Sequence, residues 1–385
     1  QEDMYPEVEM WHDNGFTDAG HLANLYGLDW PQSAPSNSLA SISRGTECLL
    51  RLESVATSQQ IDSQQIDSQK SDSQQVNWQA LKRVFEGYWY SQPEKLDTNS
   101  EFELADTLSL ERQLEANEMA LKAQGHYMSA MLKYAGEWYW GLDRLDHLEQ
   151  RLNSLGLAKN KQRCILYNKT YIDLYQSKAL SKPDDRLKKL TLFLSIRSPY
   201  SHIGLEQGIK LAQHYQLELE VKPVLPMIMR GLSVPSSKKM YIFHDTKREA
   251  QKLGIDYGFV ADPLGRGVER CYALFTYAQS LGCEQSYLLN YAQAVNAQGI
   301  HSDTDAGLKI IVERSGMDWS EAEKILNDPE SYTAWHGWAE KNRQQMIALG
   351  SWGVPTFQYD DLVLWGQDRA GLIEKRIQVD LLNSE

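Results

Sequence analysis

The chain has 385 residues, of which 42% are hydrophobic and 24% are charged, and its formal net charge is −13. This balance is typical of a globular protein and excludes a fibrous or wholly disordered chain, and the length is enough for two domains. Because phosphate backbones repel acidic proteins, the charge argues against nucleic acid as a partner. No apolar run reaches the roughly 20 residues that span a bilayer, so we expect no membrane partner either.

The cysteines are Cys48, Cys164, Cys271 and Cys283, and no two of them form a CxxC pair. A disulfide scaffold or a zinc site would need denser, paired spacing. We therefore expect thiols in a reducing compartment, a cytoplasmic location and no bound metal. The chain opens with Gln1 and without a basic and apolar signal, which leaves a cleaved signal or a missing segment open.

The first half of the chain contains a low-complexity stretch. Residues 58–75 read SQQIDSQQIDSQKSDSQQ, a polar repeat with almost nothing to bury, which predicts a disordered loop. The later stretch 155–187 ends in a proline, two aspartates and a charge run, which predict a linker before a new domain. The sequence therefore predicts three parts, 1–154, 155–187 and 188–385.

A strand, a helix and a second strand follow the linker. The apolar run 190–196 predicts a buried strand, residues 203–212 have helical spacing, and residues 217–224 alternate as a half-buried strand does. A strand–helix–strand unit implies parallel strands and an α/β sheet.

The remainder of the second half is mainly helical. Amphipathic helices are predicted over about 236–349, then a tight hairpin over 356–365 and a last helix over about 368–380. The order β-α-β, long helical insertion, β-β-α is that of a thioredoxin-like sheet with a helical subdomain. The predicted fold class is therefore α/β.

The hairpin region has an earlier counterpart. Residues 115–151 align with 340–376 at a constant offset of 225 with 11 identities and no gap. Chance would give about two, at roughly one match in twenty positions. Upstream, Gly27–Trp30 echoes Gly254–Tyr257. The sequence thus predicts tandem copies of one fold.

The first copy is incomplete, because it begins where the second copy is already past its second strand. Its hairpin then lacks a central sheet, and an isolated hairpin is marginally stable. We expect either a fragment, which we favour, or a first half that borrows structure from the second half or from a partner subunit. At the shared offset Pro355 corresponds to Ala130 and Val354 to Ser129, so the first copy is predicted to be structural.

Three segments could carry chemistry in the second copy. They are the turn Ser198–Ser201, the run Gly353–Thr356 and the run Trp365–Arg369, which converge in a thioredoxin-like fold. The free N–H groups at the start of a helix near Ser198 would stabilise an anion such as a thiolate. A cis bond before Pro355 would turn the preceding backbone outward to pair with an extended peptide.

These motifs resemble the kappa-class glutathione transferases and the 2-hydroxychromene-2-carboxylate isomerases, which have the DsbA-like thioredoxin fold. The resemblance covers about 190–378 and implies glutathione as cofactor, with a small electrophile as substrate. Its catalytic residue would be Ser198, which contacts the glutathione sulfur. The other residues that it implies at the glutathione site are Pro199, Lys238, Trp352, Val354, Pro355, Asp368 and Arg369.

Specific roles follow from the same resemblance. Val354 would pair with the peptide backbone of glutathione, Asp368 and Arg369 would hold its γ-glutamyl end, and Lys238 would lie near its glycyl carboxylate. The family usually has an aromatic–Asp pair shortly before the serine, where this chain has Ser195–Arg197. Arg197 either lowers the pKa of a bound thiol further or points away from it, and the substrate stays open.

Simpler interpretations exist for every candidate. Ser198 is also an ordinary N-cap residue, and thioredoxin-like folds keep the proline without any ligand. His202, the histidine nearest the turn, fits a surface or capping role better than that of a base. The remaining candidates have equally simple readings, as helix cap (Asp368), surface charge (Arg369) and core (Trp352, Trp365).

Three functions compete. The first is a glutathione-dependent isomerase, in which the thiolate attacks a conjugated keto acid, the adduct rotates and the thiol is expelled, as the resemblance implies; a kappa-like transferase would use the same site. The second, a disulfide oxidoreductase, is opposed because Ser198 and Ser201 occupy the CxxC positions. The third is a non-catalytic peptide-binding protein. A homodimer is left open.

Overall fold

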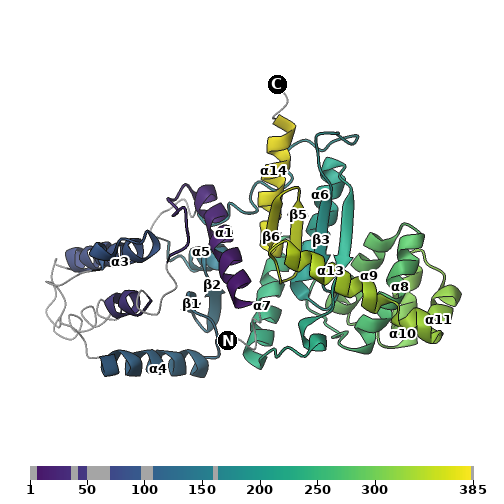
Figure 1. Ribbon diagram of the computed structural model, residues 1–385, viewed down its shortest axis with the longest axis horizontal. Helices are drawn as coiled ribbons and strands as arrows, with labels where there is room; N and C mark the ends of the chain where they lie inside the picture. The colour runs from purple at the N-terminus through teal and green to yellow at the C-terminus, as the bar shows by residue number, and fades with distance from the viewer. Residues whose placement is uncertain (1–6, 36–41, 50–69, 97–106, 159–163, 383–385) are drawn as a thin grey trace. The chain divides into compact units, whose positions relative to one another are not determined.

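The computed structural model describes residues 7–35, 42–49, 70–96, 107–158 and 164–382. The chain divides into two compact units (Figure 1). Unit 1 comprises Gln1–Tyr26 and Met128–Glu385, and unit 2 comprises Gly27–Tyr127. Unit 1 contains all the residues predicted to form the site. No helix in the described residues is long and apolar enough to cross a lipid bilayer.

In the described residues of unit 1, four strands form a mixed sheet in the order β4-β3-β5-β6. Strand β3 runs parallel to β4 and antiparallel to β5, and β5 and β6 form the predicted hairpin. This arrangement confirms the thioredoxin-like sheet expected from the sequence. The strands are β3 (Leu190–Leu194), β4 (Leu219–Pro223), β5 (Thr356–Tyr359) and β6 (Leu362–Trp365).

Strand β3 lies in the middle of three layers, which explains why its sequence is apolar except for Thr191. All five of its residues are buried. On one face, Leu192 packs against α6 (Pro199–Tyr215), with α14 (Ala370–Leu382) beside that helix. On the other face, Phe193 clusters with Met346 of α13 (Trp335–Ala348). A strand covered on both faces has no polar side to alternate with.

Helix α6 begins where the sequence provides both a cap and a proline. The Ser198 side chain accepts a hydrogen bond from the Ser201 N–H at 3.3 Å, and Pro199 occupies the first helical position. The helix ends at Tyr215, and the next residue, Gln216, adopts a left-handed conformation with φ of 52°. The cap and the proline thus fix Ser198 at the start of α6, shortly after the C-terminal end of β3.

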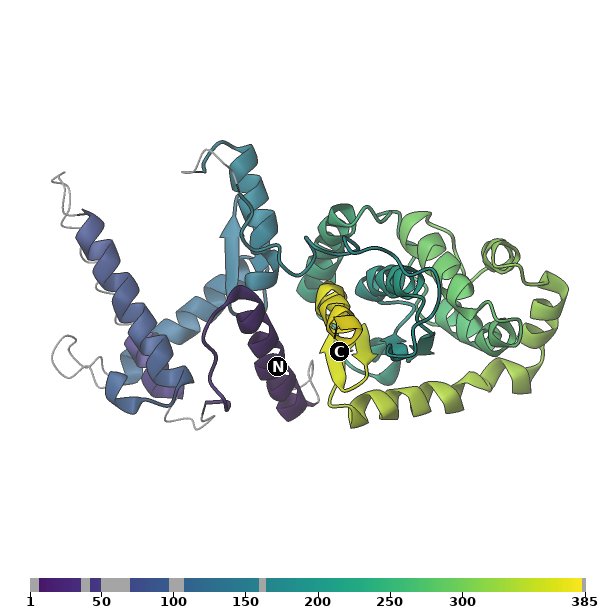
Figure 2. The same ribbon diagram turned by 90° about the horizontal axis from the view of Figure 1, so that it is seen from above.

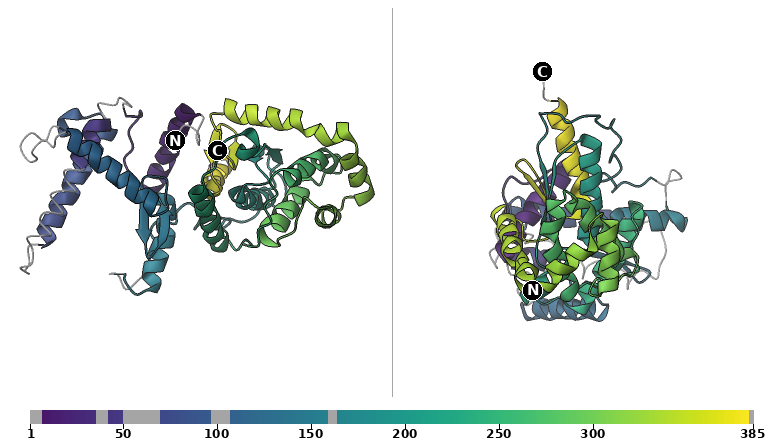
Figure 3. Two further views of the ribbon diagram at one scale, coloured as in Figure 1. Left: turned by 90° about the horizontal axis from the view of Figure 1, so that it is seen from below. Right: turned by 90° about the vertical axis from the view of Figure 1, so that its right-hand side faces the viewer.

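The helical insertion lies beside the sheet, and α13 returns from it to the sheet (Figures 2 and 3). Its helices bury one side in the main core, which includes Tyr272, Tyr291 and Val312. The short helix η3 (Met227–Arg230) precedes it. The bounds are α7 (Ser236–Lys252), α8 (Arg266–Ser280), α9 (Glu284–Ala297), α10 (Asp305–Arg314), α11 (Trp319–Asn327) and α12 (Pro329–Thr333).

Unit 1 also contains helix α1 (Val8–Tyr26) and a second hairpin. Within the described residues, β1 (Met131–Tyr134) pairs with β2 (Glu137–Trp140) alone. The short helix η2 (Leu142–Arg144) and helix α5 (Leu145–Ser154) follow. The bounds of β1, β2 and η2 lie exactly 225 residues before those of β5, β6 and η4 (Gln367–Arg369). This agreement supports the tandem repeat, which stays a prediction.

The two irregular stretches differ from their predictions. Residues 58–69 lie outside the described residues, but 70–75 belong to α3 (Lys70–Trp89), so the loop prediction was wrong there. Glutamine and lysine are good helix formers, and their polarity does not prevent a helix. Residues 164–187 contain neither helix nor strand, as expected of a linker, yet the Tyr175 N–H donates to Glu374 at 3.0 Å. This stretch is therefore anchored on unit 1, and the predicted three-part division stays a prediction.

Unit 2 is a small helical unit. It contains a helix over 42–49, α3, the short η1 (Pro93–Lys95) and α4 (Thr107–Ala123). Its core joins Cys48, Val84 and Leu96. The Gly87 Cα approaches Leu96 so closely that a Cβ there would lie 2.9 Å from the leucine side chain.

Candidate functional site

Ser198 lies between β3 and α6, at the positive end of the helix. Its oxygen accepts the Ser201 N–H, which leaves the hydroxyl hydrogen to donate elsewhere. Ser201, the second serine of the turn, is buried, and its oxygen accepts the Ser195 N–H at 3.2 Å. The two serines thus have different local roles. Ser198 is half-buried and can meet a ligand, whereas Ser201 fixes the turn.

The Val354–Pro355 peptide bond is cis. Pro355 lies directly against α6, because a Cβ on Gly204 would be only 2.8 Å from the proline Cβ. The proline carbonyl accepts the Gly366 N–H at 2.9 Å, which links the segment to the turn before η4. The structure therefore brings together the serine helix, the proline segment and the Asp–Arg turn, as the sequence predicts.

Trp352 and Trp365 support the proline segment. Trp352 is buried, its ring centroid lies 5.5 Å from that of Trp365, and the Trp365 indole packs onto Gly353, where any Cβ would clash. This packing explains why the segment before the proline carries glycine. A direct contact between Trp352 and glutathione stays a prediction.

Lys238 lies in the first turn of α7 and is 9% exposed. Burial disfavours its charged form and lowers its pKa to about 8. A buried cation of this kind would gain from a ligand carboxylate, which fits the predicted contact with the glycyl end of glutathione.

Asp368 and Arg369 do not lie open at the surface. The Arg369 guanidinium is 4% exposed and binds both carboxylate oxygens of Asp18 at 2.6 Å and both of Asp143 at 2.9 Å. Asp368 receives Arg144 at 2.7 Å and Arg369 at 3.1 Å. The reading of Arg369 as a surface charge is therefore wrong, because four carboxylate oxygens surround it.

The charges around Asp368 compensate for its burial. Desolvation opposes its ionisation, but attraction by Arg369 and Arg144 outweighs desolvation and holds the pKa of Asp368 below its usual value. Arg144, from the first half of the chain, therefore contributes to keeping Asp368 charged.

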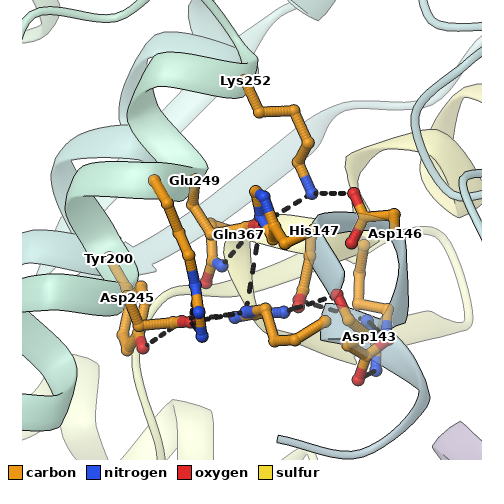
Figure 4. Close-up of polar contacts among 12 residues, drawn as sticks. Asp143, Asp146, His147, Tyr200, Asp245, Glu249, Lys252 and Gln367 are labelled. Atoms are coloured by element: carbon orange, nitrogen blue, oxygen red, sulfur yellow. Dashed lines mark hydrogen bonds and ion pairs between the residues drawn. The ribbon is translucent and has the colours of Figure 1, made fainter. Parts of the chain in front are cut away.

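Asp245 of α7 connects this charge group to the serine turn (Figure 4). Its carboxylate accepts the Tyr200 hydroxyl at 2.7 Å and binds the Arg144 Nε at 2.9 and 3.0 Å. Burial, together with the Asp245 charge, raises the pKa of Tyr200 well above its usual value, so Tyr200 stays a neutral phenol that donates to Asp245. The sequence reasoning missed Asp245 and Arg144 as neighbours of the site and gave Tyr200 no role beyond its place in the serine turn, although Arg144 was visible as the repeat partner of Arg369.

Arg197 and His202 each lie beside a carboxylate. Arg197 makes two hydrogen bonds to Asp262, at 2.8 and 2.6 Å, so its charge is neutralised by that carboxylate. His202 is buried, whereas the sequence predicted a surface or capping position. Its Nε2 lies 3.3 Å from Glu206. The helix face that carries His202 packs into the protein, which the position next to a turn does not reveal.

Comparisons with known proteins identify the domain that contains this site. A family model described as DSBA-like thioredoxin domain matches residues 189–378. The 2-hydroxychromene-2-carboxylate isomerase of Pseudomonas putida is 26% identical over 190 residues, which are 47% of this chain and 90% of that enzyme.

The solved structures that align with this chain do so over about half of its length. A 2-hydroxychromene-2-carboxylate isomerase aligns at 25% identity and a TM-score of 0.43, over 51% of this chain and 99% of that one. A probable DsbA oxidoreductase from Streptomyces coelicolor aligns at 15% identity and a TM-score of 0.41, over 51% of this chain and 92% of that one. The family match and the sheet order agree that residues 189–378 form a DsbA-like thioredoxin domain.

Proposed function

We propose that this protein is a glutathione-dependent, isomerase-like enzyme that acts on a conjugated keto acid or a related small electrophile. The observation that carries the proposal is the placement of the Ser198 hydroxyl at the start of α6, the helix that packs on the cis proline Pro355. The similarity to an isomerase of Pseudomonas putida favours isomerisation as the reaction.

Each residue has a distinct task in this proposal. Ser198 donates its hydroxyl hydrogen to the sulfur, and the free N–H groups of the first turn of α6 add a positive potential that favours the thiolate. The backbone of Val354 pairs with the tripeptide, and Pro199 and Trp352 line its path. The Lys238 ammonium holds the glycyl carboxylate. Glutathione, when bound, would supply the nucleophilic thiolate.

The γ-glutamyl end fits Asp368 better than Arg369. Asp368 keeps 13% of its side chain exposed, whereas Arg369 keeps 5% and already binds four carboxylate oxygens. A ligand ammonium would join Arg144 and Arg369 around Asp368. We therefore assign Asp368 as the direct acceptor and Arg369 as the residue that positions it.

Two other functions would use the same residues. A kappa-like transferase would consume glutathione in a net conjugation, whereas an isomerase returns it, so an assay of glutathione consumed per substrate turned over separates them. A non-catalytic peptide-binding protein is favoured by the full pairing of Arg369, because its charge is then not available to a ligand carboxylate.

Calorimetric titration of the intact protein with glutathione tests the proposal. We expect saturable binding that weakens in Ser198→Ala and is retained in Ser198→Thr, which keeps the hydroxyl and the helix cap. Ser280→Ala is the matched control, because this exposed serine at the end of α8 bonds only its own helix, at Tyr277 O. Absence of binding at millimolar glutathione would end the glutathione proposal.

A further inference from the structure

Two arginines tie the N-terminal part of unit 1 to the thioredoxin domain by equivalent contacts. Arg144 of η2 binds Asp245 of α7 and Asp368 of η4. Arg369 of η4 binds Asp18 of α1 and Asp143 of η2. Each arginine therefore binds two aspartates of the other half of the chain. One aspartate lies in a long helix, and the other is the neighbour of the second arginine. Figure 4 shows part of this group, with Asp143 and Asp245 labelled.

The contacts of Arg144 correspond to the contacts of Arg369 when each residue is replaced by its counterpart in the other half of the chain. Asp143 and Arg144 precede Asp368 and Arg369 by 225 residues, within the aligned repeat. Asp18 precedes Asp245 by 227 residues. The same spacing separates Gly27 from Gly254, which end α1 and α7 with φ of 67° and 68°. Helix α1 thus corresponds to α7.

Reciprocal contacts of this kind are the signature of a two-fold interface, in which residue i contacts j and j contacts i. Here both partners belong to one chain. We propose that α1 and residues 131–154 form a built-in partner, covering within the same chain the surface through which a second copy of the thioredoxin domain would otherwise bind. Because this surface is already covered within one chain, it is not available to bind a second chain.

Charged groups around the two bridges favour this pairing over a symmetric dimer of thioredoxin domains. Glu249 and Lys252 of α7 contact His147 at 2.6 Å and Asp146 at 3.2 Å, respectively. The side chains of these four residues are nearly buried. Among the described residues, the other half of the interface has no equivalent ion pairs. The residues at the equivalent positions are Leu22, Leu25, Leu372 and Gly371.

In a dimer of two thioredoxin domains, Glu249 and Lys252 would face Leu372 and Gly371 of the other copy. Glu249 would lose its imidazole partner and Lys252 would lose the Asp146 carboxylate, at the cost of burying charge with fewer partners. A dimer of two N-terminal parts would bury Asp146 and His147 against leucines. Only the pairing of an N-terminal part with a thioredoxin domain gives partners to the charged groups on both sides. The charges therefore disfavour both symmetric dimers.

Chemical cross-linking of the full chain tests the proposal. Lys133 and Lys247 are both exposed and lie on the two sides of this interface. Lys133 lies over the Trp138 ring, and the Trp138 carbonyl accepts the side chain of Arg248, the neighbour of Lys247. An amine-reactive bifunctional reagent should link the two lysines. Lys189 and Lys222 serve as an internal control, because both bind Glu220 within the sheet.

The cross-linked protein is separated on a denaturing gel, and linked peptides are identified by mass spectrometry. We expect the Lys133–Lys247 link in the band of one chain. The same link confined to the band of two chains, or its absence where the Lys189–Lys222 link forms, would overturn the proposal.

The arginine bridges are tested in the same assay. The double variant Arg144→Gln, Arg369→Gln should lower the yield of the Lys133–Lys247 link relative to the control link by at least about fivefold. Arg144→Lys, a milder change, should lower it in the same direction and guards against a double variant that fails to fold. Arg343→Gln, which breaks a surface pair with Glu340 within α13, should leave the ratio unchanged. An unchanged ratio in both arginine-bridge variants would contradict the proposal.

Discussion

The Arg369 guanidinium binds both carboxylate oxygens of Asp143 at 2.9 Å, across 226 residues of sequence. This pair joins η2 of the N-terminal part to η4, beside Asp368 of the proposed glutathione site. Because Arg369 is almost fully buried, its carboxylate partners are needed for stability as well as for the local charge. The folding of the N-terminal part and the binding of a ligand at Asp368 are therefore expected to depend on each other.

Arg369→Gln should destabilise unit 1 strongly. The substitution leaves Asp18, Asp143 and Asp368 without their shared cation, and breaking a buried ion pair typically costs about 3–5 kcal/mol. Urea unfolding followed by circular dichroism measures the loss. Arg343→Gln should change the free energy of unfolding by less than about 0.5 kcal/mol, as is usual for surface positions. Equal stability of the two variants would refute the structural role of Arg369.

Gly204→Ala tests the close contact between α6 and the cis proline. The new Cβ would lie 2.8 Å from the Pro355 Cβ, so either the helix or the proline must move, at a cost of about 1–3 kcal/mol. Glutathione affinity should fall as well, because Ser198 and Val354 would shift relative to each other.

Gly337→Ala is the matched control for this substitution. It also lies in a helix, but a Cβ there meets no atom within 4 Å. Alanine is the better helix former, so this variant should be more stable by up to about 1 kcal/mol and should bind glutathione normally. The close-contact argument is wrong if both variants behave alike in thermal unfolding and calorimetry.

Ligand binding at Lys238 should depend on pH. The pKa of Lys238 is about 8, so its ammonium charge is lost from the ligand-free protein as the pH rises above that value. Affinity for S-methylglutathione, whose sulfur cannot ionise, should then fall by up to about tenfold per pH unit. Calorimetry from pH 7 to pH 9.5 measures this, at roughly half-unit steps. In Lys238→Gln the affinity should fall with pH only as far as ionisation of the ligand itself requires. If the affinity of both proteins depends on pH in the same way, Lys238 does not bind the ligand.

The same lysine should affect stability with the opposite dependence on pH. Between pH 8 and 10.5, the ordinary pKa of a lysine, the unfolded chain binds a proton that the folded protein has released. The free energy of unfolding of the wild type should therefore rise with pH in this window relative to Lys238→Met, and the difference should be constant below it. Urea unfolding at several pH values measures the difference, and a falling difference would contradict the depressed pKa.

The thioredoxin sheet was predictable because each of its elements has a local signal. The apolar run 190–196 predicted β3, although the strand ends at Leu194 because the chain already turns there, with the Ser198 N–H donating to the Ser195 carbonyl. The hairpin over 356–365 was predicted from two short strand-like runs on either side of Asp360 and Asp361, and Asp360 has the turn conformation, with φ of 55°. Such local patterns depend on neighbouring residues and need no knowledge of the tertiary structure.

The environment of the Asp–Arg pair was not predictable in the same way. Asp18 and Arg369 are 351 residues apart, and a lone aspartate on an amphipathic helix carries no local sign of its partner. The offset between the Asp–Arg pairs did reveal that Arg144 and Arg369 are equivalent. It could not reveal that each arginine would bind the aspartates of the other half, because that depends on how the two halves pack.

The most direct test of the account compares glutathione with S-methylglutathione in the wild type and in Ser198→Ala. In the proposed function the Ser198 hydroxyl donates to a thiolate, and hydrogen bonds to charged groups contribute about 1.5–3 kcal/mol. Ser198→Ala should therefore weaken the binding of glutathione by roughly tenfold to a hundredfold, and that of S-methylglutathione by much less. Equal losses for both ligands, or no loss for either, would show that Ser198 only caps α6 and does not hold the sulfur.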